Sequence, residues 1–482
     1  AAVDAALADK PAGLLAPVPS KAAVAKVKAV LADAATADKA LGAEPATLPA
    51  AVRAPVAARA ALAREIGLFA DSLESIEKNA EELPKYAAAF DKQLAKEPNS
   101  QFAPALNEAK ALTDSVLGDA PARKAAADKL GAFGTSRASN MLRKLYDAAV
   151  RSGDQELAAA VEPNLAKAEG YQRKVRLVQY TFAGLSTGSI YVLLALGLAI
   201  IFGLMGVINM AHGEFMMVGA FTTYAVATWF KGAFPNSYDY FPILAVPAAF
   251  LVAGAIGLLT EFLVIRHLYG RTVETLLATI GVGYILIQAA RVQFGDNVSY
   301  AAPTWMQGSM EVAADLQLNR ARLWTIVYCV LCITVVYLLV NKTRLGLLLR
   351  ATTQNRQMAA ALGVPTRRVD ALTFAFGAGL AGMAGVVVPM IDKINPGMGQ
   401  DYVVSSFMVV VVGGVGKLAG AIIAGLGLGA VGNYLEPLLG SFKAFASTAS
   451  VLGKVLVLAG VVVFLQWRPS GLFPPKGRVA DA

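Results

Sequence analysis

Apolar residues are spread unevenly along the chain: long apolar runs begin near residue 177 and alternate with short polar segments almost to the end. A helix needs about 20 mostly apolar residues to cross a bilayer. Val178 to Val207 has that length and carries no ionisable side chain. By this criterion we predict nine spans, near 178–207, 213–231, 243–265, 275–294, 323–340, 369–391, 403–415, 418–436 and 451–467. The predicted fold is all-α, a polytopic transmembrane helix bundle of about eight or nine spans.

The first third of the chain has a different pattern. Residues 1–170 are rich in Ala, Leu, Lys and Glu, which are strong helix formers, and they lack an apolar run long enough to cross a membrane. Around residues 66–76 the apolar positions fall three to four apart, on one face of a helix: Ile66, Phe69, Leu73 and Ile76. We therefore predict a soluble α-helical domain over 1–170 and a transmembrane domain over 171–482.

A cluster of three polar residues follows the first predicted span. Asn209, His212 and Glu214 lie within six residues of one another, between Gly206 and a further apolar run. One interpretation is a turn at the membrane edge, with Asn209 and Glu214 as helix caps. The other is a broken helix whose interrupted backbone lines a translocation route. A metal site is disfavoured, because one His and one Glu make a poor ligand set.

Glycines interrupt the region of the seventh and eighth predicted spans. The seventh, 403–415, is short for a full crossing, and the interruption contains Gly413, Gly414, Gly416 and Gly420. Small residues at such positions allow helices to approach closely. We therefore expect a helix break with close packing here, and the seventh span is a candidate re-entrant segment.

The distribution of charge indicates how the chain is oriented in the membrane. The formal net charge is +9, but the positive clusters lie between apolar spans, which argues against a nucleic-acid-binding module. Segment 341–368 contains six basic residues and no acid, so the positive-inside rule places it in the cytoplasm. Counting spans back from it places residues 1–170 outside. Cys329 and Cys332 lie at helical spacing in one apolar run and are predicted to be packing residues.

The basic segment also contains a predicted helix, from Leu345 to Leu362. Gly363 and Pro365 supply the stop signal. The spacing places a mixed set on one face: Arg350, Gln354, Met358 and Ala361. Such a helix is suited to docking in a groove of another protein, and the alternative is a surface helix at the lipid headgroups. The sequence holds no GxxxxGK[ST] phosphate loop, so energy from ATP would have to come from another chain.

Four blocks of the sequence carry a family resemblance. They are INMAHGEFMMVGA (208–220), EFLVIRHLYGRTVETLLATIGVGYILIQAARVQFG (261–295), RLGLLLRATTQNRQMAAALGVPTRRVD (344–370) and FMVVVVGGVGKLAGAIIAGLGLG (407–429). Over about 177–478 the chain resembles the permease subunits of branched-chain amino acid and urea ABC importers, and the last three blocks are most similar to the urea branch. At Thr272, Ile280 and Ser405 it departs from residues typical of that branch.

The resemblance implies a multi-pass permease of the bacterial inner membrane, with no catalytic residue and no cofactor of its own. ATP would be bound and hydrolysed by two partner ATPase subunits, and the further partners would be a second permease, an extracytoplasmic substrate-binding protein and membrane lipid. The N-terminal domain would be periplasmic. The basic segment would correspond to the coupling helix, which assigns to ATPase contact Arg350, Ala351, Gln354, Asn355, Ala359, Ala360 and Gly363.

The same resemblance suggests urea or short amides as the substrate. Urea is small and neutral, so a pore for it needs carbonyls, amides and hydroxyls. The expected pathway residues are Asn209, His212, Glu214, Thr279, Gln288 and Asn395. Gln288 serves equally well as an interhelical hydrogen-bonding residue, and Glu261 is expected to pair with Arg266 or Arg271.

Three alternatives stay open at this point. The first is a permease for branched-chain amino acids, which keeps the mechanism and changes the substrate. The second is a membrane-anchored scaffold or sensor, in which the N-terminal domain binds a partner and the spans only hold it. The third is a passive urea channel, which would work without any ATPase.

Overall fold

The structure is a computed structural model that describes residues 83–96, 103–391, 393–442 and 446–473. The predicted helix around Ile66 to Ile76 lies outside these residues. The described residues form two compact units. One comprises the chain up to Gln179 together with Gly308–Asn319, and the other comprises Tyr180–Gln307 and the chain from Arg320 onward.

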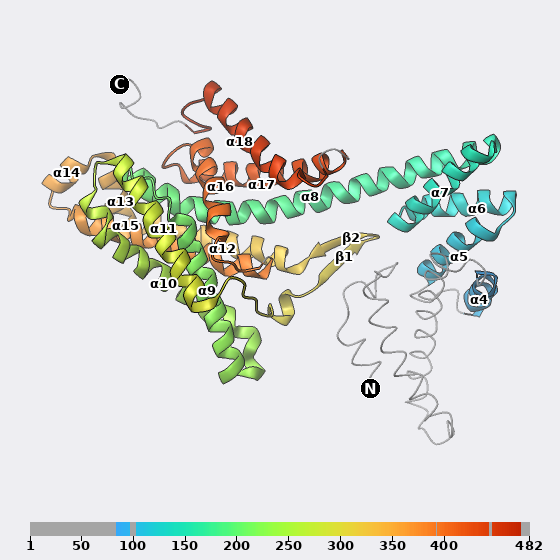
Figure 1. The fold of residues 1–482 in the computed structure, drawn as a ribbon, viewed down its shortest axis with the longest axis horizontal. Coiled ribbons are helices and arrows are strands. Elements are labelled where there is room, and N and C mark those ends of the chain that lie inside the picture. The colour runs from blue at the N-terminus through green and yellow to red at the C-terminus, as the bar shows by residue number, and fades with distance from the viewer. Residues whose placement is uncertain (1–82, 97–102, 392, 443–445, 474–482) are drawn as a thin grey trace, which may run out of the picture. The chain divides into compact units, whose positions relative to one another are not determined.

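The first unit is built from helices and one hairpin (Figure 1). Its helices are α4 (Leu83–Lys96), α5 (Ala103–Leu117), α6 (Ala120–Phe133), α7 (Ser136–Ser152) and the first half of α8 (Gln155–Met205). Side chains cap three of them: Asp119 accepts from the Ala122 N–H at the start of α6, Thr135 from the Ala138 N–H at the start of α7, and Asp154 from the Leu157 N–H at the start of α8. Such caps satisfy backbone donors that a helix end leaves free.

The core of this unit is apolar and is made by residues of α5, α6, α7 and α8. Its buried residues include Leu112, Leu130, Leu142 and Val161, each with almost no exposed surface. Burying such side chains removes apolar surface from water and holds the helices together. A soluble helical part was expected here, and the described residues of this unit are helical apart from the hairpin.

The hairpin was not predicted. Strands β1 (Ser309–Ala313) and β2 (Leu316–Asn319) pair antiparallel, and they belong to the first unit although they lie between two transmembrane helices in the sequence. At their turn Asp315 has a φ of 62°, in the left-handed region that Asp tolerates better than most residues.

Asp315 attaches the hairpin to the helices of the first unit. Its carboxylate accepts from Gln172 Nε2 at 3.0 Å and from the Ser136 N–H, and its backbone carbonyl accepts from Gln179 Nε2 at 3.0 Å. Tyr171 donates to the carbonyl of Ala314 at 3.1 Å. These bonds satisfy polar groups of a turn that would otherwise need water.

The second unit begins in α8 and contains the remaining helices. They are α9 (His212–Ala233), η3 (Pro235–Tyr240), α10 (Phe241–Leu263), η4 (Ile265–His267), α11 (Thr272–Phe294), η5 (Thr304–Met306), α12 (Arg320–Lys342), α13 (Arg344–Gln354), α14 (Arg356–Ala361), α15 (Thr366–Val387), η6 (Val388–Met390), α16 (Met398–Gly413), α17 (Leu418–Gly440) and α18 (Ala449–Trp467).

These helices confirm the predicted fold class. Seven stretches of the described chain are long and apolar enough to cross a membrane: α8, α10 with its flanking turns, α11, α12, α15 with η6, α17 and α18. Two more apolar helices, α9 and the shorter α16, occupy the positions of the second and seventh predicted spans. All nine predicted spans therefore coincide with a helix, within about five residues at each end except at the start of the first, because α8 already begins at Gln155.

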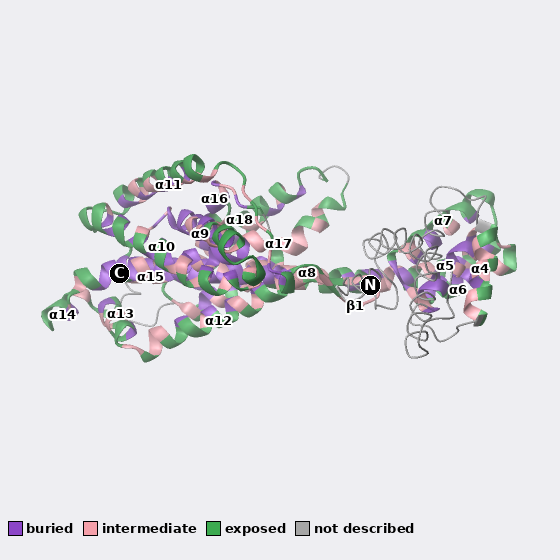
Figure 2. Cartoon of the chain, turned by 90° about the horizontal axis from the view of Figure 1, so that it is seen from below, coloured by how far each residue is buried: buried purple, intermediate pink, exposed green. Residues whose placement is uncertain are grey.

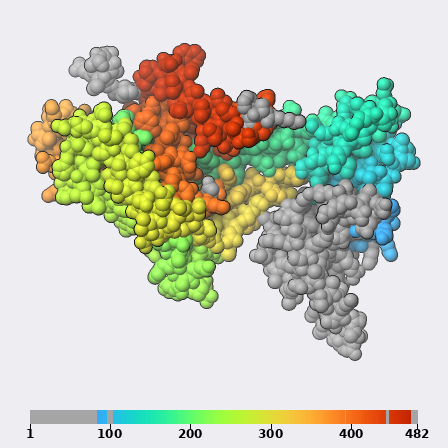
Figure 3. Space-filling model, in the orientation of Figure 1, coloured from blue at the N-terminus to red at the C-terminus, as the bar shows by residue number. Residues whose placement is uncertain are grey.

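The core of the second unit lies around α9 and α15. Buried residues make up half of α9 and most of α15, and Phe215 meets Phe374 edge to face, with ring centroids 6.1 Å apart. In Figure 2 these helices are mainly purple, whereas α11 is largely green. Figure 3 shows α11 and α18 on the surface, in yellow-green and red. The outer helices expose apolar side chains, as expected where lipid or another subunit replaces water.

Candidate translocation site

The chain breaks after α8 and re-enters the bundle. Gly206 has a φ of 64°, which a residue with a side chain rarely adopts, and α9 begins only at His212. His212 Nε2 lies 3.0 Å from the carbonyl of Leu194, eleven residues before the end of α8. That spacing corresponds to about 16 Å along a helix. The start of α9 is therefore level with the middle of the apolar half of α8.

A second break lies between α15 and α16. The chain turns through η6 and reaches α16 at Met398, and the 16 residues of α16 span about 24 Å, less than the hydrocarbon core. The connection to α17 is short, and Gly413 packs against Gly420, where an added Cβ would lie 2.5 Å from the backbone. The expected close-packed glycine break is confirmed.

The two interrupted helices meet at their first turns. A Cβ added to Gly213 of α9 would lie 2.1 Å from the carbonyl oxygen of Gly399 in α16. Only glycine permits two backbones to approach so closely. Each helix N-terminus carries a partial positive charge from its unpaired N–H groups. The contact therefore places two positive helix ends side by side inside the bundle.

Buried polar side chains surround this contact. Asn209, His212 and Glu214 have exposed fractions of 1%, 0% and 3%. Thr279 of α11 joins them: its hydroxyl accepts from the Met210 N–H at 3.1 Å and donates to the carbonyl of Leu276 at 2.8 Å. The structure thus brings together four of the six expected pathway residues from two segments far apart in the sequence.

Three atoms of this group have no hydrogen-bond partner among the described residues. They are Asn209 Nδ2, His212 Nδ1 and Glu214 Oε2. The Glu214 carboxyl faces Gly283 of α11, where an added Cβ would lie 3.3 Å from its carboxyl carbon. Buried polar atoms are nearly always paired in native proteins, so unpaired ones indicate a water, an ion or a substrate. Interrupted helices with free polar groups are the usual form of a transporter binding site.

The capping interpretation fails for Asn209. Its Oδ1 accepts from the Ala211 N–H at 3.1 Å, which is a local turn, and the residue preceding α9 is Ala211, with no side-chain cap. The side chains of Asn209 and His212 are also buried within the bundle. The geometry is therefore that of an interrupted helix, and its role as a route for substrate stays a prediction.

The other two expected pathway residues lie elsewhere. Gln288 is on the exposed face of α11, where its Oε1 accepts from Arg291 at 3.4 Å. Asn395 is half-buried in the turn before α16, and its carbonyl accepts from the Met398 N–H at 3.1 Å. Neither joins the cluster at the start of α9. Helical periodicity places Gln288 and Thr279 on opposite faces of one helix, but it does not identify which face meets α9.

Two smaller predictions are confirmed. Arg266 Nη2 lies 3.5 Å from Glu261 Oε2, so this buried acid has the cationic partner that was expected. Cys329 and Cys332 are both buried and form no disulfide, as expected for packing residues. No group of three or more potential metal ligands occurs within the described ranges.

The predicted single helix over 345–362 is wrong, because two helices occupy it. Asn355 has an extended conformation, with φ −156° and ψ 100°, which ends α13. Its side chain then accepts from the Met358 N–H at 2.9 Å and begins α14. Asn competes with helical backbone bonding through such local contacts. The stop at Gly363, with a φ of 85°, is confirmed.

The seven expected ATPase-contact residues differ in exposure. Five are exposed: Arg350, Gln354, Asn355, Ala360 and Gly363. Ala351 is half-buried and Ala359 is 4% exposed, so Ala359 supports the fold of this segment from inside. Arg350 and Gln354 also line a cleft of about 210 Å³ beside Gly203 and Gly416. Fewer residues are thus exposed for contact with an ATPase than the resemblance implies.

Sequence reasoning missed the residue that fixes α14. The Arg356 guanidinium binds Asp370 of α15 through both ends of the carboxylate, one contact being 3.1 Å. It also lies over the Tyr269 ring, 4.2 Å from the centroid, and donates to its hydroxyl. Bidentate, stacked guanidinium contacts are the most geometrically specific pairs that proteins make. The signal available in the sequence was the lone acid Asp370, two residues after Arg368.

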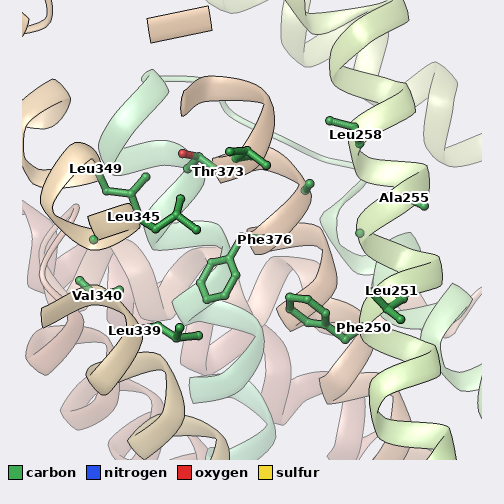
Figure 4. A pocket seen from close by; sticks show the side chains of 14 residues that line it. Phe250, Leu251, Ala255, Leu258, Leu339, Val340, Leu345, Leu349, Thr373 and Phe376 are labelled. Atoms are coloured by element: carbon green, nitrogen blue, oxygen red, sulfur yellow. The ribbon is translucent and has the colours of Figure 1, made fainter. Parts of the chain in front are cut away.

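An apolar pocket of about 380 Å³ opens between α10, α12, α13 and α15 (Figure 4). Phe250 and Phe376 form part of its wall, with ring centroids 5.9 Å apart. Its one polar side chain, Thr373, donates its hydroxyl to the carbonyl of Val369 at 2.6 Å. The lining therefore offers no free polar group for recognising a polar substrate.

Comparisons with known proteins agree with this architecture. Residues 180–465 match the family described as branched-chain amino acid transport system / permease component. The chain is 32% identical over 309 residues to the high-affinity branched-chain amino acid transport system permease protein BraD of Pseudomonas aeruginosa, covering 61% of this chain and 95% of BraD. It is 31% identical to LivH of Salmonella typhimurium, covering 52% and 83%.

A more distant relative extends the comparison. The chain is 26% identical over 311 residues to LivM of Escherichia coli, covering 59% of this chain and 68% of LivM. No solved structure matches the chain. Because the family match covers more than half of the sequence, the chain belongs to the branched-chain amino acid transport system permease family, as a multi-pass, non-catalytic transport component of the inner membrane.

Proposed function

We propose that this chain is the substrate-translocating subunit of an ABC importer, and that substrate passes the meeting point of α9 and α16. The single observation that carries this proposal is the contact between Gly213 and Gly399, surrounded by buried and unpaired polar atoms. A scaffold whose spans only hold a domain in the membrane has no need for unpaired polar groups at their centre. Importers need such groups because a polar solute exchanges its water shell for them.

Branched-chain amino acids are the favoured substrate. The relatives at about one-third identity are all named for branched-chain amino acid transport. Urea, which the blocks over 261–295, 344–370 and 407–429 suggest, is the second candidate. The Glu214 carboxylate favours the amino acid, because a carboxylate attracts an ammonium group and has no charge to meet in urea.

The energy source is a pair of separate ATPase subunits that dock at α13 and α14. Exposed Arg350 and Gln354 provide the contact, and the clamp from Arg356 to Asp370 passes a displacement of α14 to α15. A second permease and an external substrate-binding protein complete the assembly. The amphipathic alternative, a helix lying on lipid headgroups, predicts no effect of these residues on ATP hydrolysis.

The orientation follows from the hairpin as well as from charge. Gln179 donates a hydrogen bond to the backbone carbonyl of Asp315 in the hairpin. The chain therefore enters the bundle in α8 and leaves the bundle after α11 on the same side of the membrane. Helix α12 then carries the chain across to the basic segment 341–368, which the positive-inside rule assigns to the cytoplasm. These features support our proposal that the first unit is periplasmic.

The test is uptake into proteoliposomes that hold the chain with its co-purifying subunits. Labelled leucine and labelled urea are each offered with and without ATP inside. We expect leucine entry that needs ATP and that fails in an Arg350→Glu variant with normal membrane insertion. The Arg344→Glu variant is the matched control, because Arg344 is exposed on the same helix and lies outside the expected contact set.

Each other outcome selects an alternative. Urea entry driven by ATP keeps the mechanism and changes the substrate. Urea entry without ATP indicates a passive channel, and absence of any flux in a correctly inserted complex indicates a scaffold. Equal loss in both arginine variants would show a general effect of charge and would remove the assignment of Arg350.

A further inference from the structure

A second cleft, distinct from the α9–α16 contact, lies between α8, α16, α17 and α18. Its volume is about 420 Å³, within the range of about 300–1,000 Å³ typical of small-molecule sites. Unlike the pocket of Figure 4, it combines charged and apolar side chains. The polar ones include Asp401, Asn433, Glu436 and Lys454.

The polar side chains gather at one end of the cleft. Asp401 lies in the first turn of α16, Lys454 near the start of α18, and Glu436 in the last turn of α17, which runs the opposite way. Two contacts fix this register: Lys454 Nζ is 3.2 Å from Asp401 Oδ1, and a Cβ on Gly453 would lie 3.9 Å from the Glu436 Cα. Further along each helix the lining is apolar, with Met408, Leu428 and Leu458.

These charges cannot face lipid. The side chains of Asp401 and Lys454 are 65% and 68% exposed, although both belong to apolar helices of the bundle. A lysine can extend its long side chain to the membrane surface, but an aspartate is too short to do so. Ionised groups within a membrane face water or a polar partner. This face of the chain therefore meets water or a polar partner in the assembled transporter.

The end of the cleft offers both signs of charge. Asp401 and Glu436 supply two carboxylates, and the C-terminus of α17 adds a partial negative charge. Lys454 supplies an ammonium, and the N-termini of α16 and α18 add partial positive charges. Gln400 and Asp401 directly follow Gly399, the residue that meets α9. The cleft thus lies beside the proposed route.

We infer that this cleft binds a free α-amino acid with an aliphatic side chain as its zwitterion. The inference rests on the proposed function and names the substrate-recognising residues within it. The ion pair between Asp401 and Lys454 opens, Asp401 and Glu436 receive the ammonium, and Lys454 receives the carboxylate. The aliphatic side chain lies along Met408, Leu428 and Leu458. Urea cannot replace the broken ion pair because it carries no charge.

The experiment measures access to the cleft directly, without the binding protein. Ser405 lines the cleft and is half-buried, so a Ser405→Cys variant of the full chain, held with its subunits in nanodiscs, reports occupancy through N-ethylmaleimide labelling. The two native cysteines are buried and give little background. A Val451→Cys variant is the matched control, because Val451 is 63% exposed on α18 and does not line the cleft.

Leucine should slow labelling of the Ser405→Cys variant and leave the Val451→Cys variant unchanged. Urea, leucinamide and 4-methylpentanoate should not slow this labelling. Urea carries no charge, leucinamide lacks the carboxylate, and 4-methylpentanoate lacks the ammonium group. Adding Lys454→Met should weaken leucine protection about tenfold or more, the usual effect of losing a hydrogen bond to a charged group. It should also remove the preference for leucine over leucinamide. Asp401→Asn should likewise remove the preference for leucine over 4-methylpentanoate, and it keeps the test valid if Lys454→Met fails to fold.

The inference is overturned if urea protects as well as leucine, if lysine protects better, or if neither variant changes protection. Protection at both cysteine positions would indicate a general conformational change and would also overturn it. Failure here is separable from failure of the proposed function. ATP-driven leucine uptake with no protection at Ser405→Cys removes this cleft alone, whereas absence of uptake removes the proposed function independently.

Discussion

Glu214 is the one acidic side chain in the polar cluster at the start of α9. It is 3% exposed, one carboxyl oxygen has no partner among the described residues, and it lies one residue after the contact between Gly213 and Gly399. Two helix N-termini next to a carboxylate stabilise its charge without consuming its hydrogen-bonding capacity. The side chain is therefore available to a passing solute, which distinguishes it from Glu261 with its partner Arg266.

Replacing Glu214 by Gln should lower ATP-driven uptake about tenfold or more, because the neutral isostere keeps the packing and removes a charge-assisted contact. Initial uptake rates in proteoliposomes, normalised to inserted protein, measure the effect. Glu274→Gln is the control, since Glu274 pairs with Arg271 on the exposed start of α11. Uptake within twofold of the unaltered protein would assign Glu214 to packing alone.

The Arg356–Asp370 clamp gives a second prediction at this scale. Arg356→Lys should disturb α14 almost as much as Arg356→Ala, because lysine cannot form the bidentate contact or stack on Tyr269. A double-mutant cycle with Asp370→Asn should give a coupling energy of about 0.5–3 kcal/mol in thermal unfolding of the complex. Substrate-stimulated ATP hydrolysis should fall in the same variants. Additive effects in the cycle would contradict the clamp.

At the scale of elements, the break between α13 and α14 is the clearest departure from expectation. Asn355 ends one helix and caps the next, which turns a predicted straight docking helix into an angled pair. The exposed residues expected to contact the ATPase are thereby divided, with Arg350 and Gln354 on α13 and Ala360 on α14. The proposed docking surface depends on this break, because a continuous helix would carry Gln354 and Met358 on one face.

Asn355→Ala should therefore destabilise α14 by about 1 kcal/mol, the usual cost of losing an N-cap, while Asn355→Ser should retain most of the cap. Amide hydrogen exchange over 356–361 in the full complex measures the difference. We expect faster exchange in the Ala variant and near-normal exchange in the Ser variant. Faster exchange in both would point to a role of the Asn side chain outside α14.

Elements were predictable from sequence to different degrees, for physical reasons. Apolar length located the transmembrane helices well, because the bilayer imposes one requirement on every span. The hairpin was missed because the alternation in Ser309–Ala313 and Leu316–Asn319 is short, and its stability comes from Gln172 and other distant partners. Thr279 was anticipated as a polar residue, but its contact with Met210 depends on the register of α9 against α11.

Across the whole molecule, the first unit joins parts of the chain that are far apart in sequence, and acids lie at that junction. Glu108 is fully buried; burial raises its pKa, although Arg137 at 3.3 Å acts in the opposite direction. Burial next to Asp315 raises the pKa of Glu311 on β1 to about 7. Both groups favour the protonated form in the folded unit, so folding binds protons that the unfolded chain releases.

The hairpin should therefore be held more firmly at pH 5 than at pH 8. Its stability falls as pH rises from the ordinary pKa of glutamate through about 7. Amide exchange of 309–319 in the full chain, corrected for intrinsic rates, measures this, and Glu311→Gln should flatten the dependence. A hairpin that becomes better protected as pH rises would reverse the assigned sign.

The hairpin also has a consequence for biosynthesis. Residues 308–319 leave the ribosome about 130 residues after Gln179. At about 5–20 residues per second this interval lasts about 6–26 s. Until then Tyr171 lacks its partner Ala314, and Gln172 has the Gly134 carbonyl as a partner but not Asp315. The first unit therefore completes its fold only after α9, α10 and α11 have been made, so its maturation depends on synthesis of the first part of the membrane bundle.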